Sequence, residues 1–144
     1  MLVQQILKSK EKQGVITVKP ESSVAEAAAI LSRNRIGSVV VSCTGKTVDG
    51  ILSERDIVCE LGKRGAGCLT DMVKNMMTKS PVTCGFDQTA DEILQKMTVG
   101  RFRHMPVMQG GELIGIITIG DAVKARLSEL SMEKEALEGM IMGH

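Results

Sequence analysis

The sequence predicts an α/β protein of the α+β type, with two βαββα units packed around a pseudo-two-fold axis and an extended C-terminal helix. The chain has 144 residues, of which 43% are hydrophobic and 24% charged, and this suits one domain or two very small ones. The sequence also repeats itself once, and each copy has the same order of strand and helix patterns. Because a unit of roughly 60 residues buries too little apolar surface to be stable alone, we expect the two copies to pack face to face.

The internal repeat keeps an almost constant register. Residues 35–41 match residues 101–107 at an offset of 66, and residues 50–58 match residues 115–123 at an offset of 65. An upstream pair of apolar segments matches at an offset of 70, residues 3–7 with residues 73–77. The repeat predicts units at residues 1–64 and 65–127, with a helical extension at 128–144.

The first copy reads as strand, helix, strand, strand, helix. Ser22 and Ser23 are typical of a helix start, and the apolar residues that follow them have helical spacing. Gly45 and the pair Asp49-Gly50 predict a turn between two strands. The expected elements are strands at 15–18, 38–42 and 51–52, with helices after Ser23 and from 54 to about 61.

The second copy predicts the same order. Thr89 marks a helix start, and the pair Gly110-Gly111 marks a hairpin turn. We expect strands at 82–84, 105–108 and 113–117, a helix at 89–97 and a final helix from Ile119. Residues 63–70 contain several Gly and Ala residues and predict a flexible linker between the copies.

Composition and motifs exclude several classes of function. The formal net charge is +1 and the two phenylalanines are the only aromatic residues, so we expect no nucleic-acid binding. No apolar stretch approaches membrane-spanning length, and we expect a soluble, cytoplasmic protein. The four cysteines form no C-x-x-C pair, which predicts buried reduced thiols and no metal site. No nucleophile, phosphate-loop or metalloprotease motif is present, so we expect no enzyme activity and no required cofactor.

One motif with chemical potential, G-x-x-[ST]-x-x-D, occurs at equivalent places in both copies. Its residues are Gly50, Ser53 and Asp56 in the first copy and Gly115, Thr118 and Asp121 in the second. Each hydroxyl lies where a strand ends and a helix begins, so backbone amides and hydroxyl can hold a phosphate while the carboxylate accepts hydrogen bonds from a diol. The same pattern is also an ordinary capping box that needs no ligand. Its use in both copies favours a nucleotide site.

These features together resemble a tandem pair of cystathionine-β-synthase-type (CBS) domains. The resemblance rests on the βαββα repeat, on the motifs GILSERD and GIITIGD, and on RIGSVVV paired with RFRHMPV, and it covers about residues 1–127. Such pairs commonly bind adenine nucleotides and usually regulate a partner. The resemblance implies AMP as the first ligand to test, with ADP, ATP, NAD-type dinucleotides and S-adenosylmethionine as alternatives.

The resemblance also implies two clefts, each built from both copies. Residues of the first cleft are Ser53, Asp56, Val82, Arg103, His104 and Met105. Those of the second are Ile16, Gly37, Ser38, Ile116, Thr118 and Asp121. Arg55 is expected to reach a phosphate in the second cleft, and its counterpart Gly120 cannot, so the two sites should differ in affinity.

The C-terminal extension carries an apolar stripe at heptad-like spacing, formed by Val123, Leu127, Leu130, Leu137 and Ile141. The stripe can pack on its own domain or contact a second copy, and the resemblance favours a homodimer. The leading interpretation is a nucleotide sensor that signals in trans to an unknown protein partner. The alternative is a structural or dimerisation module with degenerate clefts.

Overall fold

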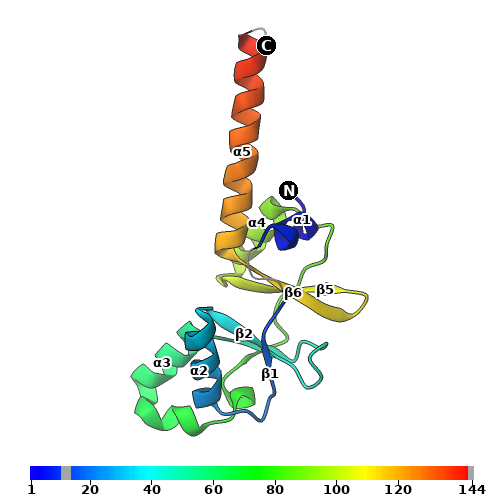
Figure 1. Ribbon diagram of the computed structural model, residues 1–144. Coiled ribbons are helices and arrows are strands. Elements are labelled where there is room, and N and C mark those ends of the chain that lie inside the picture. The colour runs from blue at the N-terminus through cyan, green and yellow to red at the C-terminus, as the bar shows by residue number, and fades with distance from the viewer. Residues whose placement is uncertain (11–13, 143–144) are drawn as a thin grey trace.

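The computed structural model describes residues 1–10 and 14–142, and its two repeats lie one above the other (Figure 1). The first repeat contains a four-stranded sheet in the order β1-β2-β3-β4. Strand β1 (Thr17–Val18) runs parallel to β2 (Ser38–Val41), which pairs antiparallel with β3 (Gly50–Ser53). The edge strand β4 (Thr78–Lys79) pairs antiparallel with β3 and comes from the segment that precedes the second repeat.

Two helices complete the first repeat. Helix α2 (Val24–Asn34) begins after Ser23, whose hydroxyl accepts the Glu26 amide, and helix α3 (Glu54–Arg64) follows β3 directly. Apolar residues of β2 and β3 pack with those of both helices in one core, where Val39, Val41 and Leu52 are fully buried. The predicted helices and the strands at 38–42 and 51–52 are therefore confirmed. The strand ends differ from the prediction by one residue, and α3 ends three residues later than predicted.

The second repeat has the same order with a longer hairpin. Strand β5 (His104–Gln109) pairs antiparallel with β6 (Glu112–Thr118), and the turn between them uses Gly110 and Gly111, both at positive φ. Helix α4 (Ala90–Gly100) and helix α5 (Ile119–Ile141) flank this hairpin. The strand expected at 82–84 is reduced to one bridge, in which Cys84 pairs in parallel with Val107.

The opening segments of the two repeats are exchanged. Helix α1 (Val3–Ser9) packs in the core of the second repeat, and Figure 1 shows it beside α4 at the base of α5. The 3₁₀ turn η2 (Val73–Asn75) packs in the core of the first repeat instead. The sequence predicts that residues 1–64 form the first repeat. In the structure, α1 packs in the core of the second repeat instead.

Matching backbone hydrogen bonds hold the exchanged segments. The Val3 amide donates to the Gln88 carbonyl at 2.8 Å, and the Val73 amide donates to the Ser22 carbonyl at 2.7 Å. Helix α1 thus covers the start of α4, and η2 covers the start of α2. A two-fold relation between the repeats accounts for the arrangement, because each copy supplies its neighbour with the same missing apolar piece.

The segment expected to be a flexible linker is helical. Helix α3 extends to Arg64 and continues into the 3₁₀ helix η1 (Gly65–Thr70), where the Cys68 side chain is buried. Arg64 forms ion pairs with Glu60 and Asp71, both at 2.7 Å. The expectation of buried thiols holds for Cys68 and Cys84, but Cys43 and Cys59 are exposed.

Helix α5 leaves the body of the protein after its first turns and extends into solvent (Figure 1). Its early residues Ala122 and Ala125 are buried, whereas Leu127 is 62% exposed and Leu137 is 59% exposed. The stripe predicted from heptad spacing therefore does not pack on its own domain beyond the first turns. No helix within the described residues has the length and apolar character that crossing a bilayer requires.

Candidate functional site

Both copies of the G-x-x-[ST]-x-x-D motif form complete capping boxes. The Ser53 hydroxyl accepts the Asp56 amide at 3.2 Å, and one Asp56 carboxylate oxygen accepts the Ser53 amide at 2.9 Å. In the second copy, Thr118 and Asp121 exchange the same bonds at 3.1 and 2.9 Å. Each box satisfies backbone groups at the start of a helix, and only one carboxylate oxygen is used for this purpose.

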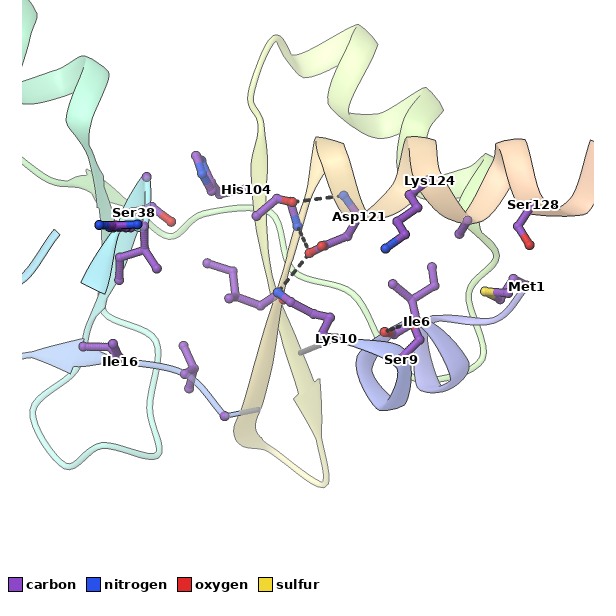
Figure 2. A pocket seen from close by; sticks show the side chains of 18 residues that line it. Met1, Ile6, Ser9, Lys10, Ile16, Ser38, His104, Asp121, Lys124 and Ser128 are labelled. Carbon is purple, nitrogen blue, oxygen red and sulfur yellow. Dashed lines mark hydrogen bonds and ion pairs between the residues drawn. The ribbon is translucent and has the colours of Figure 1, made fainter. Parts of the chain in front are cut away.

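A cavity of about 690 Å³ lies between the two repeats beside the second capping box (Figure 2). It includes seven of the site residues expected from the sequence, namely Ile16, Gly37, Ser38, His104, Ile116, Thr118 and Asp121. Six of these are the residues assigned to the second cleft, with the exception of Arg55. His104, expected in the first cleft, lines this one instead.

The walls come from several parts of the chain. The first repeat contributes residues 14–16, just before β1, and residues 35–38, which lead into β2. The second repeat contributes the start of β5, the end of β6 and the first turns of α5. Helix α1 closes one side with Ile6 and Ser9. Apolar walls together with a few convergent polar groups are the usual character of a small-molecule site.

Gly37 allows the two repeats to approach closely. A Cβ atom at this position would lie 3.0 Å from Nε2 of His104, which is the edge of the imidazole. The Gly37 carbonyl also accepts the Glu54 amide at 2.9 Å, so the backbone here is fixed to the start of α3. A larger residue would push His104 from its place in the cavity wall.

The imidazole of His104 is partly buried between the repeats. Burial lowers its pKa below the usual 6.5, and the positive charges of Arg103 and Lys10 act in the same direction. The carboxylates of Glu54 and Asp121 oppose this shift. At neutral pH the ring is therefore uncharged and offers one donor and one acceptor.

Lys10 is a cavity residue that the sequence reasoning missed. Its Nζ atom donates to the Ile116 carbonyl at 2.9 Å and lies 2.9 Å from Oδ2 of Asp121 (Figure 2). Lys124 and Arg35 also line the cavity. The offset of 70 between residues 3–7 and 73–77 is the one sequence signal that bears on Lys10, and it does not reveal the exchange that carries Lys10 to Asp121.

The residues expected in the first cleft are not assembled in the same way. Neither this cavity nor a second one, of about 500 Å³ between α2 and α3, is lined by Ser53, Asp56, Val82, Arg103 or Met105. The Met105 side chain is fully buried in the core of the second repeat, because alternation along β5 turns it toward α4 and α5. Val82 is 47% exposed and lies outside the single bridge, at Cys84, to which the strand expected at 82–84 is reduced.

Arg55 also differs from its expected place. It lies at the second position of α3, is exposed, and does not line the cavity. Lys10, Arg35 and Lys124 supply the positive charge in the cavity wall instead. Within residues 1–10 and 14–142, no group of three or more His, Cys, Asp or Glu side chains is placed to hold a metal ion.

Comparison with known proteins agrees with this architecture. A family model described as the CBS domain matches residues 9–63 and again residues 73–128. A CBS domain-containing protein of Arabidopsis thaliana, CBSCBSPB2, is 30% identical over 124 residues, which are 86% of this chain. The chain spans only 23% of the length of that relative.

Solved structures match the fold over most of the chain. The CBS-domain protein ATU1752 from Agrobacterium tumefaciens is 44% identical with a TM-score of 0.82, and the match covers 88% of this chain and 99% of that one. CBSX2, solved in complex with AMP, is 26% identical with a TM-score of 0.71, over 88% and 96% of the two chains. The CBS domain pair of MJ0100, solved with 5′-methylthioadenosine and S-adenosyl-L-methionine, is 25% identical with a TM-score of 0.75, over 86% and 98%. Two family matches in tandem, on two pseudo-symmetric repeats, show that this chain belongs to the CBS-domain family as a CBS pair.

Proposed function

We propose that this protein is a regulatory module that binds an adenosine-containing ligand, AMP in the first place, in the cavity between its two repeats. The observation that carries the proposal is the meeting of six residues from both repeats, Ile16, Gly37, Ser38, Ile116, Thr118 and Asp121, around one space of about 690 Å³. That volume lies within the range of about 300–1,000 Å³ that is typical of small-molecule sites. Relatives of the same fold have been solved with AMP or with S-adenosylmethionine and methylthioadenosine.

The chemistry of the walls suits such a ligand. Ile16 and Ile116 provide apolar contact for the flat base, and the Gly37 and Ser38 backbone offers hydrogen bonds to its edge. Oδ2 of Asp121 already serves the capping box and Lys10, which leaves Oδ1 to accept a ribose hydroxyl. The Thr118 hydroxyl accepts the Asp121 amide and keeps its own proton to donate.

Regulation follows from the position of α5. The ligand would contact the beginning of the same helix that extends into solvent, because Thr118, Asp121, Lys124 and Ser128 all face the cavity. Binding shifts the packing of α5 only to the extent that it favours one arrangement over another. We propose that α5 conveys this change to a second copy of the chain and to a protein partner in trans.

The test compares the two capping boxes. Asp121→Asn keeps an oxygen that can cap the helix but removes the carboxylate charge, and we expect it to weaken AMP binding about tenfold in calorimetric titration, as for loss of a charged hydrogen bond. Asp56→Asn makes the same change in the box outside the cavity and should leave the affinity unchanged. The opposite ranking would place the ligand in the first cleft.

A second candidate is an interaction module that needs no ligand. The exposed apolar stripe of α5 favours it, since it offers a surface for another helix. Absorbance separates the two candidates, because the chain has no Trp or Tyr and nearly no absorbance of its own at 260–280 nm. A 260 nm absorbance band from a molecule that is released on denaturation supports the ligand-binding regulatory module. A flat spectrum, with no binding of AMP or S-adenosylmethionine, supports the interaction module.

A further inference from the structure

The cavity has an excess of positive charge. Lys10, Arg35 and Lys124 line it against the single carboxylate of Asp121, and His104 adds no charge at neutral pH because burial lowers its pKa. Two other acids lie close by. Glu54 on α3 approaches Gly37 and His104, and Glu129 on α5 forms an ion pair with the Met1 amino group.

Lys10 forms an ion pair with Asp121, the acid that we expect to contact the ribose. Its side chain is 19% exposed and that of Asp121 is 22% exposed, so both charges are largely shielded from water. The Ile116 carbonyl and Oδ2 of Asp121 hold the ammonium in place, each at 2.9 Å from Nζ. A ligand whose diol contacts Oδ1 of Asp121 therefore lies beside the Lys10 ammonium.

We propose that Lys10, supported by Lys124, makes this cavity selective for phosphorylated adenosine ligands over uncharged or sulfonium-bearing ones. The proposal rests on the proposed function. A phosphate forms a charge-assisted hydrogen bond with an ammonium group, and partial burial strengthens it. A sulfonium brings a second positive charge to the same place and is repelled. The thioether of methylthioadenosine has neither effect.

The capping box of the first repeat has no equivalent lysine beside it. At the offset of 70 that relates the exchanged segments, the counterpart of Lys10 is Ser80, which is exposed. A hydroxyl carries no charge, so the same selectivity is not expected beside Asp56. The chain thus distinguishes its two capping boxes by one lysine from an exchanged segment.

The test measures a ratio of affinities. We would titrate AMP and methylthioadenosine into the intact wild-type chain and into Lys10→Met, Lys124→Met and Lys74→Met, where Lys74 is an exposed lysine outside the cavity. In Lys10→Met the preference for AMP should fall about tenfold, which corresponds to loss of one charge-assisted hydrogen bond. Lys124→Met should give a smaller fall, because Lys124 is exposed, and Lys74→Met should give none.

Two controls keep the result interpretable. Lys10→Arg retains the charge and should retain the preference for AMP, which guards against a loss of binding caused by loosening of α1. An unchanged ratio in Lys10→Met would overturn the selectivity while leaving the proposed function intact. If the wild-type chain binds neither ligand, the proposed function itself fails.

Discussion

Gly37 faces His104 across the interface of the two repeats so closely that a Cβ atom at Gly37 would lie 3.0 Å from Nε2 of His104. The contact joins the start of β2 to the start of β5, which are equivalent places in the internal repeat. It also forms part of the cavity wall, since both residues line the cavity. Packing between the repeats and the shape of the site therefore depend on the same contact.

Gly37→Ala should destabilise the protein by about 1 kcal/mol, because the imidazole must move to admit the methyl group. Gly62→Ala is a matched control inside α3, where a Cβ meets no atom within 4 Å. It should stabilise the helix by up to about 1 kcal/mol. Urea unfolding of both variants measures the difference, and equal effects would contradict the contact.

Met105→Ala tests whether this side chain serves the core or a ligand. Met105 is fully buried, so its truncation should lower the free energy of unfolding by about 2–5 kcal/mol. Val82→Ala, at a position that is 47% exposed, should have an effect within about 0.5 kcal/mol. A near-neutral Met105→Ala in thermal unfolding would return Met105 to the list of ligand contacts.

Acid should weaken the protein through His104. Burial lowers its pKa in the folded state below the usual 6.5, so the unfolded chain binds the proton more tightly. The stability that the neutral ring contributes is complete above about pH 6.5 and is lost as the pH falls toward the folded-state pKa. His104→Gln removes the titration, and its loss of stability between pH 7.5 and 5.5 should be smaller than that of the wild type. Parallel stability curves would contradict this assignment.

The exchanged segments predict opposite patterns of local stability. Val3 and Val73 are both fully buried, the first in the core of the second repeat and the second in the core of the first. Val3→Ala should cost about 2 kcal/mol and reduce hydrogen-exchange protection mainly in α4, β5 and β6. Val73→Ala should do so mainly in β2, β3 and α2. If Val3→Ala instead reduced protection mainly in the first repeat, or Val73→Ala mainly in the second, the exchange would be refuted.

The stripe on α5 should control self-association. Leu130 and Leu137 are 44% and 59% exposed, and both belong to the heptad-like series. Leu137→Glu places a charge in that series and should shift sedimentation toward the monomer at micromolar concentration. Ser131→Glu adds the same charge next to the series and should not. Identical behaviour of the two variants would argue against the stripe as an interface.

The sequence by itself determined the repeat, the order of the elements and the positions of the helix starts. These depend on local chemistry, since Ser23, Ser53, Thr89 and Thr118 each cap a helix within three residues of their own position. Thr118 and Asp121 in the cavity also followed from the repeated motif, and the resemblance to CBS pairs implied Ile16, Gly37, Ser38 and Ile116.

Only the tertiary structure decided the exchange of α1, the inward direction of Met105 and the presence of Lys10 at Asp121. Lys10 and Asp121 are separated by most of the chain, and their pairing depends on which core α1 enters. Both cores accept an apolar segment of the same pattern, so hydrophobic spacing cannot choose between them. The two-fold packing of the repeats decides between the two cores, because it determines which helix start lies within reach of each segment. Each segment then forms its backbone hydrogen bonds with that helix start.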